Sequence, residues 1–174
     1  MRTTQFRFLN LLIVILFAVI PALAEVKLPA LFSDNMVLQS STRVPIWGTA
    51  APGEKITVSL GQQRVSATAD DAGGWRIELG PMNTGGPFEL TVEGSNTLTL
   101  RNVAVGEVWI CSGQSNMEMA VGNSPRAWGG VLNAEQEIAA GNYPMIRQFT
   151  VKKGVAGQPQ ADAEGQWVVA SPQT

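Results

Sequence analysis

The chain has 174 residues, of which 45% are hydrophobic and 15% charged, with 12 basic and 14 acidic side chains and a net charge of −2. That length suffices for one domain, or for one small domain plus part of another, and the weakly acidic balance excludes the basic footprint of a nucleic-acid-binding protein. With one cysteine and no histidine, the chain lacks an internal disulfide and the usual transition-metal ligands, so we expect no metal and no cofactor.

The first 24 residues are organised as a secretory signal peptide. Arg2 and Arg7 precede the unbroken apolar run Leu11–Ile20, and Ala22–Ala24 supplies the small residues of a cleavage site. The apolar run is shorter than the ~20 residues that a membrane-spanning helix needs. We therefore expect cleavage after Ala24 and an exported chain, periplasmic or extracellular, without a stable membrane anchor.

Residues 25–104 read as short strands separated by turns. Apolar and polar residues alternate within the strands, and Gly, Pro, Asn and Asp cluster between them, which is typical of antiparallel strands with one buried face. About seven strands at this spacing predict a small antiparallel β-sandwich, of the immunoglobulin or jelly-roll kind. The expected strands are Met36–Leu38, Arg43–Ala50, Lys55–Leu60, Arg64–Ala69, Trp75–Leu79, Phe88–Val92 and Leu98–Val103, with a Gly/Pro loop over Gly80–Pro87.

Three residues of this region carry further expectations. Pro45 has no backbone N–H, so it indicates an edge position or the start of a strand. Trp47 and Trp75 are expected to pack in the core rather than to form a platform on which a sugar stacks, because buried aromatic rings are common in sandwiches.

The segment Val103–Met119 (VAVGEVWICSGQSNMEM) changes from apolar to small and polar at its middle. Its first half, Val103–Cys111, predicts a strand covered on both faces, as in a parallel sheet. Cys111 would then be buried, or else paired with a group outside the chain. A buried strand followed by a Gly-containing turn presents a hydroxyl to the N–H groups of the next helix, so we assign Ser115 as a nucleophile. The alternative is a turn serine that caps that helix.

Residues 105–174 read as the start of an α/β domain. Only one or two βα units are present, and a parallel sheet needs several to cover both of its faces, so we expect this domain to be incomplete in the chain. The expected elements are a turn of helix over Met117–Val121 broken by Gly122–Pro125, a helix over Asn133–Ala140 with Asn133 as N-cap, a strand over Met145–Lys152, and an apolar patch at Trp167–Val169.

Four segments resemble the sialate O-acetylesterase family of exported carbohydrate esterases, within the SGNH hydrolase superfamily. They are LFSDNMVLQ (Leu31–Gln39), VPIWGTAAPGEKITV (Val44–Val58), GGWRIEL (Gly73–Leu79) and VGEVWICSGQSNMEM (Val105–Met119). The resemblance covers essentially the whole mature chain. It implies a β-sandwich domain at residues 25–104, and at residues 105–174 the N-terminal part of a flavodoxin-like α/β/α hydrolase domain.

The resemblance also implies an activity, the removal of O-acetyl groups from sialic acids or related sugars. Ser115 matches the nucleophile of the family's GQSN block, and its backbone N–H would be one oxyanion donor. Gly113, Gln114 and Asn116 belong to the same block. We expect Gln114 and Asn116 to shape the turn, with direct substrate contact as the alternative.

The sequence departs from the family where the base should be. The family uses a histidine helped by an aspartate, but this chain has no histidine, and Asp162 and Glu164 do not match that motif. Three hypotheses remain open. The chain is a piece of an esterase with an incomplete site, a non-catalytic exported β-sandwich that binds a glycan or a protein, or one half of a split enzyme whose second chain supplies the base.

Overall fold

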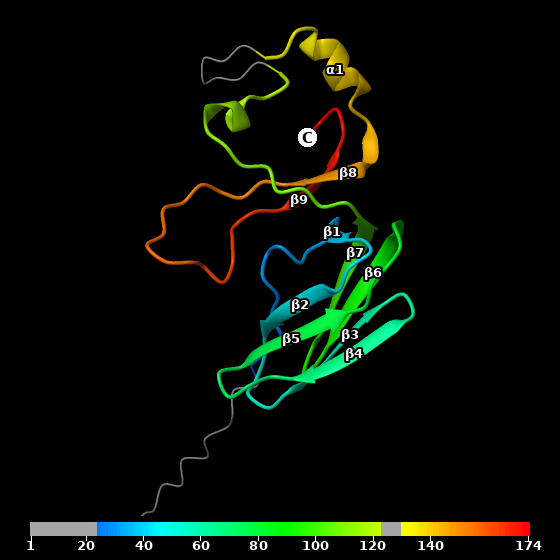
Figure 1. Cartoon of the computed structure of the whole chain (residues 1–174), viewed down its shortest axis with the longest axis vertical. Helices are drawn as coiled ribbons and strands as arrows, with labels where there is room; N and C mark the ends of the chain where they lie inside the picture. Colours follow the sequence, from blue (N-terminus) through cyan, green and yellow to red (C-terminus); the bar gives the residue numbers. More distant parts are fainter. Residues whose placement is uncertain (1–23, 123–129) are drawn as a thin grey trace, which may run out of the picture.

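The computed structural model describes residues 24–122 and 130–174 (Figure 1). Apart from Ala24, the predicted signal peptide of residues 1–24 lies outside the described residues. Most of the predicted break at Gly122–Pro125 does so too. Within the described ranges, no helix is long and apolar enough to cross a membrane.

Residues 25–106, here called the β module, form two sheets. One has five strands in the order β1-β7-β6-β3-β4, and the other has two, β2 and β5. The strands are β1 Val37–Gln39, β2 Val44–Thr49, β3 Lys55–Leu60, β4 Gln63–Thr68, β5 Gly74–Leu79, β6 Gly85–Glu93 and β7 Thr97–Gly106. Every predicted strand is present, although β6 starts at Gly85, inside the expected loop.

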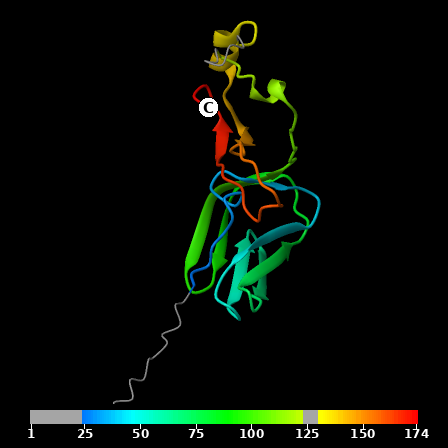
Figure 2. The same ribbon diagram turned by 90° about the vertical axis from the view of Figure 1, so that its left-hand side faces the viewer.

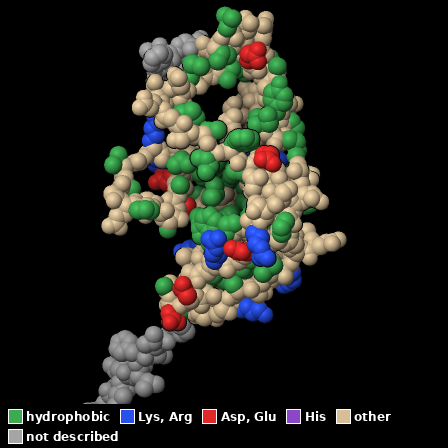
Figure 3. All heavy atoms as spheres, in the orientation of Figure 1, with side chains coloured by type: hydrophobic (Ala, Val, Ile, Leu, Met, Phe, Trp, Pro, Cys, Tyr) green, Lys and Arg blue, Asp and Glu red, His purple; other side chains and the backbone are tan. Residues whose placement is uncertain are grey.

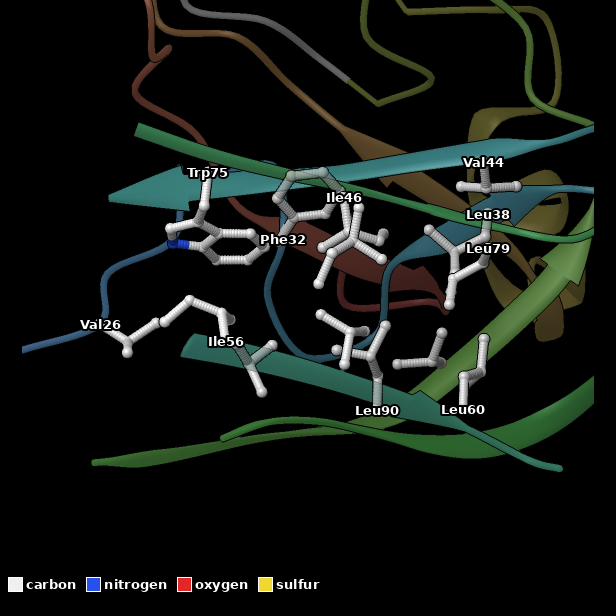
Figure 4. Close-up of a cluster of buried hydrophobic side chains, with 14 of the residues drawn as sticks. Val26, Phe32, Leu38, Val44, Ile46, Ile56, Leu60, Trp75, Leu79 and Leu90 are labelled. Atoms are coloured by element: carbon white, nitrogen blue, oxygen red, sulfur yellow. The ribbon is translucent and has the colours of Figure 1, made fainter. Parts of the chain in front are cut away.

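One hydrophobic core lies between the two sheets (Figure 4). Along β5 the side chains alternate, with Trp75, Ile77 and Leu79 buried and the residues between them exposed. They face buried residues of β3 and β6, among them Ile56 and Leu90. All the buried hydrophobic residues that the structure describes lie between Val26 and Val105, and Trp167 packs against this core from outside the β module. This alternation is what made the strands readable from the sequence.

The core placement of Trp75 is confirmed, since only 4% of its surface is exposed. Trp47 is half-buried and packs edge-on against Phe32, with ring centroids 4.6 Å apart. Pro45 lies in β2, whose one partner strand is β5, so its predicted edge position is confirmed as well.

The all-antiparallel expectation is wrong for one pair. β1 runs parallel to β7, with Val37 opposite Ala104. A parallel pair needs a long connection between its strands, and here the chain from β1 to β7 passes through β2–β6, which provides that length.

Residues 107–174 lie beyond one end of the β module (Figure 2). They contain a 3₁₀ turn η1 Ser115–Glu118, the helix α1 Ala134–Ala140, and the strands β8 Tyr143–Phe149 and β9 Trp167–Ala170. The sequence placed the helix correctly. However, Asn133 adopts a left-handed backbone with φ 59° and makes no side-chain cap bond, so it occupies the N-cap position without capping through its side chain.

The strand expected at Met145–Lys152 is present as β8, but its partner differs from the expectation. Instead of joining a parallel sheet, β8 pairs antiparallel with β9 in a two-stranded sheet. β9 coincides with Trp167–Val169, which the sequence indicated only as an apolar patch. The long connection from residue 150 to residue 166 folds back and allows the antiparallel pairing.

Glu54 ties together two loops of the β module. Its carboxylate accepts hydrogen bonds from the backbone N–H groups of Ser95 and of Ala51, the latter at 3.0 Å. These bonds, the one from Ser95 first, hold the pKa of Glu54 below its usual value. Because the folded pKa is below the unfolded one, the stabilisation is fully present above the unfolded pKa. It is lost as the pH falls through the folded pKa.

We therefore expect Glu54→Gln to lower the free energy of unfolding at pH 7, with the difference from the wild type shrinking as the pH falls below about 4. Urea unfolding at pH 7, 5 and 3 measures this. Glu89→Gln serves as the control, because the side chain of Glu89 is exposed on β6 and makes no hydrogen bond to a described residue. A Glu54→Gln deficit that stays constant from pH 7 to pH 3 would contradict the assignment.

Candidate active site

The predicted nucleophile lies in a short turn at the end of an extended segment. The chain leaves β7 at Gly106, and the N–H of Val108 donates to Gln39 Oε1 at 2.8 Å. Ser115 is the first residue of η1 and is exposed. The N–H of Met117 donates to Gln114 O at 3.0 Å and closes the turn. At the start of such a turn the first N–H groups have no partner within it, so they remain available to an oxyanion.

A side chain at position 113 would displace the half-exposed side chain of Met117. A Cβ at this position would lie 2.9 Å from Cγ of Met117, which folds back over the turn. The following residue, Gln114, has φ −108° and ψ −136°, outside the common helix and strand regions. Gln114 and Asn116 are both exposed. This local geometry agrees with a turn-shaping part for the block, and the catalytic assignment of Ser115 stays a prediction.

The strand predicted over Val103–Cys111 is wrong in its second half. β7 ends at Gly106, and beyond it Trp109 is 80% exposed and Ile110 96% exposed. Cys111 is a free, exposed cysteine, so its predicted burial is wrong too. A strand covered on both faces needs neighbouring strands and a layer on each side. Among the described residues, no strand pairs with residues 107–111 and none of their side chains is buried.

Within residues 24–122 and 130–174, no side chain is identified as a base for Ser115. Its hydroxyl has no hydrogen bond to a described residue. The two acids weighed in the sequence have other partners: Asp162 Oδ1 accepts from Ala30 N at 2.9 Å, and Glu164 pairs with Lys152 at 2.5 Å. These contacts support leaving the base role unassigned. Among the described residues, no group of three or more His, Cys, Asp or Glu side chains is placed to hold a metal ion.

An apolar hollow lies beside the segment that leads to Ser115. A groove of about 340 Å³ runs between the β module and β8–β9, and its walls include Leu38, Trp47, Trp109, Ile110, Phe149 and Trp167. Figure 3 shows hydrophobic side chains gathered across this middle zone of the molecule. None of residues 113–116 lines the groove, so the serine turn and the groove are separate features.

Sequence reasoning missed one polar cluster, which joins the two parts of the molecule. Nη1 of Arg147, on β8, donates to the backbone oxygens of Asn35 at 3.0 Å and Asn102 at 2.7 Å, while Nη2 donates to Asn102 Oδ1 at 3.2 Å. The available signal was the asparagine at position 102 inside a predicted strand, since Asn tolerates the left-handed conformations that bulges use.

Comparison with known proteins gives the family. No family model matches the chain. The sialate O-acetylesterase of Rattus norvegicus is 36% identical to the chain over 150 residues, covering 78% of the chain and 26% of that protein. The human sialate O-acetylesterase is 35% identical over 143 residues, covering 75% of the chain and 26% of that protein. The chain is a homologue of the sialate O-acetylesterases. It spans about a quarter of the length of these curated relatives.

A solved structure supports the same relationship for this sialate O-acetylesterase homologue. The carbohydrate acetylesterase from Xanthomonas citri superposes with a TM-score of 0.78 at 37% identity, covering 85% of this chain and 33% of that one. The mostly β-strand architecture described above is therefore one that a carbohydrate acetylesterase shares. The family resemblance stated from the sequence is confirmed.

Proposed function

We propose that the chain is the nucleophile-bearing part of an exported carbohydrate O-acetylesterase that acts on acetylated sialic acids or related sugars. The observation that carries the proposal is the VGEVWICSGQSNMEM segment, in a chain about 36% identical to sialate O-acetylesterases and 37% identical to a carbohydrate acetylesterase. In this segment Ser115 is exposed at the start of a tight turn, which is the placement a nucleophile needs.

The proposed reaction is acyl transfer through Ser115. Its Oγ attacks the acetyl carbonyl carbon while a base takes the hydroxyl proton. The resulting oxyanion accepts a hydrogen bond from the backbone N–H of Ser115. The C–O bond to the sugar then breaks, the sugar oxygen takes the proton, and water hydrolyses the acetyl-enzyme. The 174 residues contain no histidine, so we propose that the base comes from residues outside this sequence, in a longer polypeptide or a second chain.

The proposal extends to the domains. We propose that residues 25–104 are a sandwich domain of the immunoglobulin or jelly-roll kind, and that residues 105–174 are the N-terminal part of an SGNH hydrolase domain. Two sheets around one core support the first assignment. The second is supported by the apolar run 108–110, which has the composition of a covered strand but is exposed and pairs with no described strand.

The test compares the chain with a chimera. Residues 25–174, the mature chain expected after cleavage at Ala24, replace the aligned third of the Xanthomonas citri acetylesterase. N-terminal sequencing of the exported protein checks that start. We expect residues 25–174 alone to release acetate from 4-nitrophenyl acetate and O-acetylated sialic acid barely above background. The chimera should be at least about 100-fold faster, because a general base contributes on that scale.

Two results would count against the proposal. Robust hydrolysis by residues 25–174 alone would mean that this sequence supplies its own base. A chimera that folds, by circular dichroism and a cooperative melt, yet hydrolyses neither ester would remove the esterase assignment. If such an inactive chain also bound glycans on an array, with binding retained in Ser115→Ala, the binding-module hypothesis would take its place.

A further inference from the structure

The left-handed residues Asn35 and Asn102 meet where β1 joins β7. Phe88 of β6 pairs with Val103 and Leu90 pairs with Leu100, so two steps along β6 match three along β7. The extra residue makes a bulge, and Asn102 within it has φ 56°. Asn35, with φ 68°, immediately precedes Met36 at the start of the β1 region. Nδ2 of Asn102 donates to Asn35 Oδ1 at 2.7 Å.

Arg147 binds the backbone oxygen of Asn102 in the bulge and that of Asn35 just before β1. One nitrogen of its guanidinium bonds both backbone oxygens and the other bonds the Asn102 side chain, while Nε donates to Pro144 O at 3.1 Å. A guanidinium presents its donors in a rigid fork, which suits four acceptors fixed in space. An ammonium at the same place has no such fork.

This cluster is not an ion pair. None of the ion pairs between described residues includes Arg147, and its partial burial lowers the pKa of the guanidinium by desolvation. Burying part of a cation whose only partners are uncharged oxygens costs free energy unless its hydrogen bonds have good geometry. The arrangement therefore depends on the bulge having this conformation, which couples β8 to the shape of β7.

We propose that Arg147 is a positioning residue, which fixes β8 to the β7 bulge and so sets the place of the serine segment relative to residues 143–170. The bulge lies four residues before Gly106, where the chain leaves β7 for the segment that leads to Ser115. The β7 bulge thus sets the direction of the segment that leads to Ser115, and it also holds β8. Only the consequence for catalysis rests on the proposed function, because the positioning can be measured without activity.

The experiment measures a distance in the chain itself. Cys111 is the single cysteine and is exposed, so one spin label goes there, and a second goes on a cysteine introduced at Gln148, an exposed residue of β8. Electron–electron double resonance then reports the spread of distances between the serine segment and β8. We expect a clearly broader distribution in Arg147→Met than in the wild type. Arg147→Lys should be broadened too, because its charge is kept but its fork is lost.

Two controls make the result specific. Arg64→Met removes an exposed arginine of β4 that pairs with Glu93, and should leave the distribution unchanged. Asn102→Gly keeps the left-handed backbone and its oxygen, so it should broaden the distribution less than Arg147→Met. If Arg147→Met lowers the melting temperature of the chain too far, Arg147→Lys decides the question. An unchanged distribution in Arg147→Lys or Arg147→Met would overturn the proposal.

The catalytic consequence is read in the chimera. There we expect Arg147→Met to lower kcat by roughly tenfold to 100-fold with little change in KM, since misplacing a reacting group by about 1 Å costs on that scale. A broadened distance distribution with unchanged kcat would show that β8 is held but does not position Ser115, and would overturn that part. An inactive chimera would remove the proposed function and leave the distance measurement to decide the positioning.

Discussion

Gly48→Ala is expected to destabilise the β module by about 3 kcal/mol, the upper end of the cost of overpacking a core. Gly48 lies in β2 opposite Trp75, and Lys27 pairs with Thr49 on the other side. A Cβ on Gly48 would overlap the backbone oxygen of Lys27 and would lie 2.8 Å from Cζ2 of Trp75. Backbone cannot yield as a flexible side chain can, so the strand pairing and the indole would both have to shift.

The measurement is chemical denaturation followed by tryptophan fluorescence, with a thermal melt beside it. For a domain of this size, about 3 kcal/mol corresponds to a fall of roughly 12–24 °C in melting temperature. Gly154→Ala is the matched control, because a Cβ there meets nothing within 4 Å. A loss of less than about 1 kcal/mol in Gly48→Ala would mean that the Lys27 segment is not held against β2.

The strands of the β module could be predicted from the sequence because each has one solvent-exposed and one buried face. The alternation in Trp75–Leu79 and in Lys55–Leu60 follows directly from packing two sheets on one core, so periodicity located these strands within one residue. Gly48 itself carried a readable signal, since a glycine inside a strand pattern marks a close backbone approach. The parallel pairing of β1 with β7 was not readable, because local periodicity carries no information on strand direction.

The prediction of a buried strand after Gly106 was wrong for a different reason. The apolar sequence of residues 107–111 indicates side chains that favour burial. The prediction assumed that neighbouring strands and layers were present to bury them. In the described structure Trp109 and Ile110 are largely exposed along one wall of the apolar groove, and no described strand pairs with their segment. Composition predicts a preference for burial, while burial itself needs partners that lie elsewhere in sequence.

The site divides in the same way. The turn at Ser115 is local, so Gly113 and the GQSN letters located it, and the structure places a tight 3₁₀ turn at that position. The Arg147 cluster is not local, because it joins residues 45 and 112 positions apart. It rests on two left-handed asparagines whose conformation is set by a bulge and by neighbouring strands. No spacing rule within the sequence connects these three residues.

Ser115→Ala is expected to lower the hydrolysis of acetyl esters by the chimera roughly 10³-fold or more, the largest effect proposed for this protein. Removing a serine nucleophile leaves only what the oxyanion donors and substrate binding contribute, and losses on this scale or larger are usual. The loss should fall on kcat and leave the folded state intact, because Ser115 is exposed and its hydroxyl bonds no described residue. Steady-state kinetics on 4-nitrophenyl acetate, with a thermal melt of each variant, measures both.

Ser112→Ala is the matched control, since Ser112 is an exposed serine of the same segment, three residues earlier. It should retain near-parental activity. In the isolated chain of residues 25–174, Ser115→Ala should leave the background rate of ester hydrolysis unchanged, because a serine without a base is a weak nucleophile at neutral pH. The two results together would show that the Ser115 hydroxyl determines the rate of hydrolysis when a base can reach it and does not affect the rate when no base can. Equal activity of Ser115→Ala and its parent in a folded chimera would refute the nucleophile assignment.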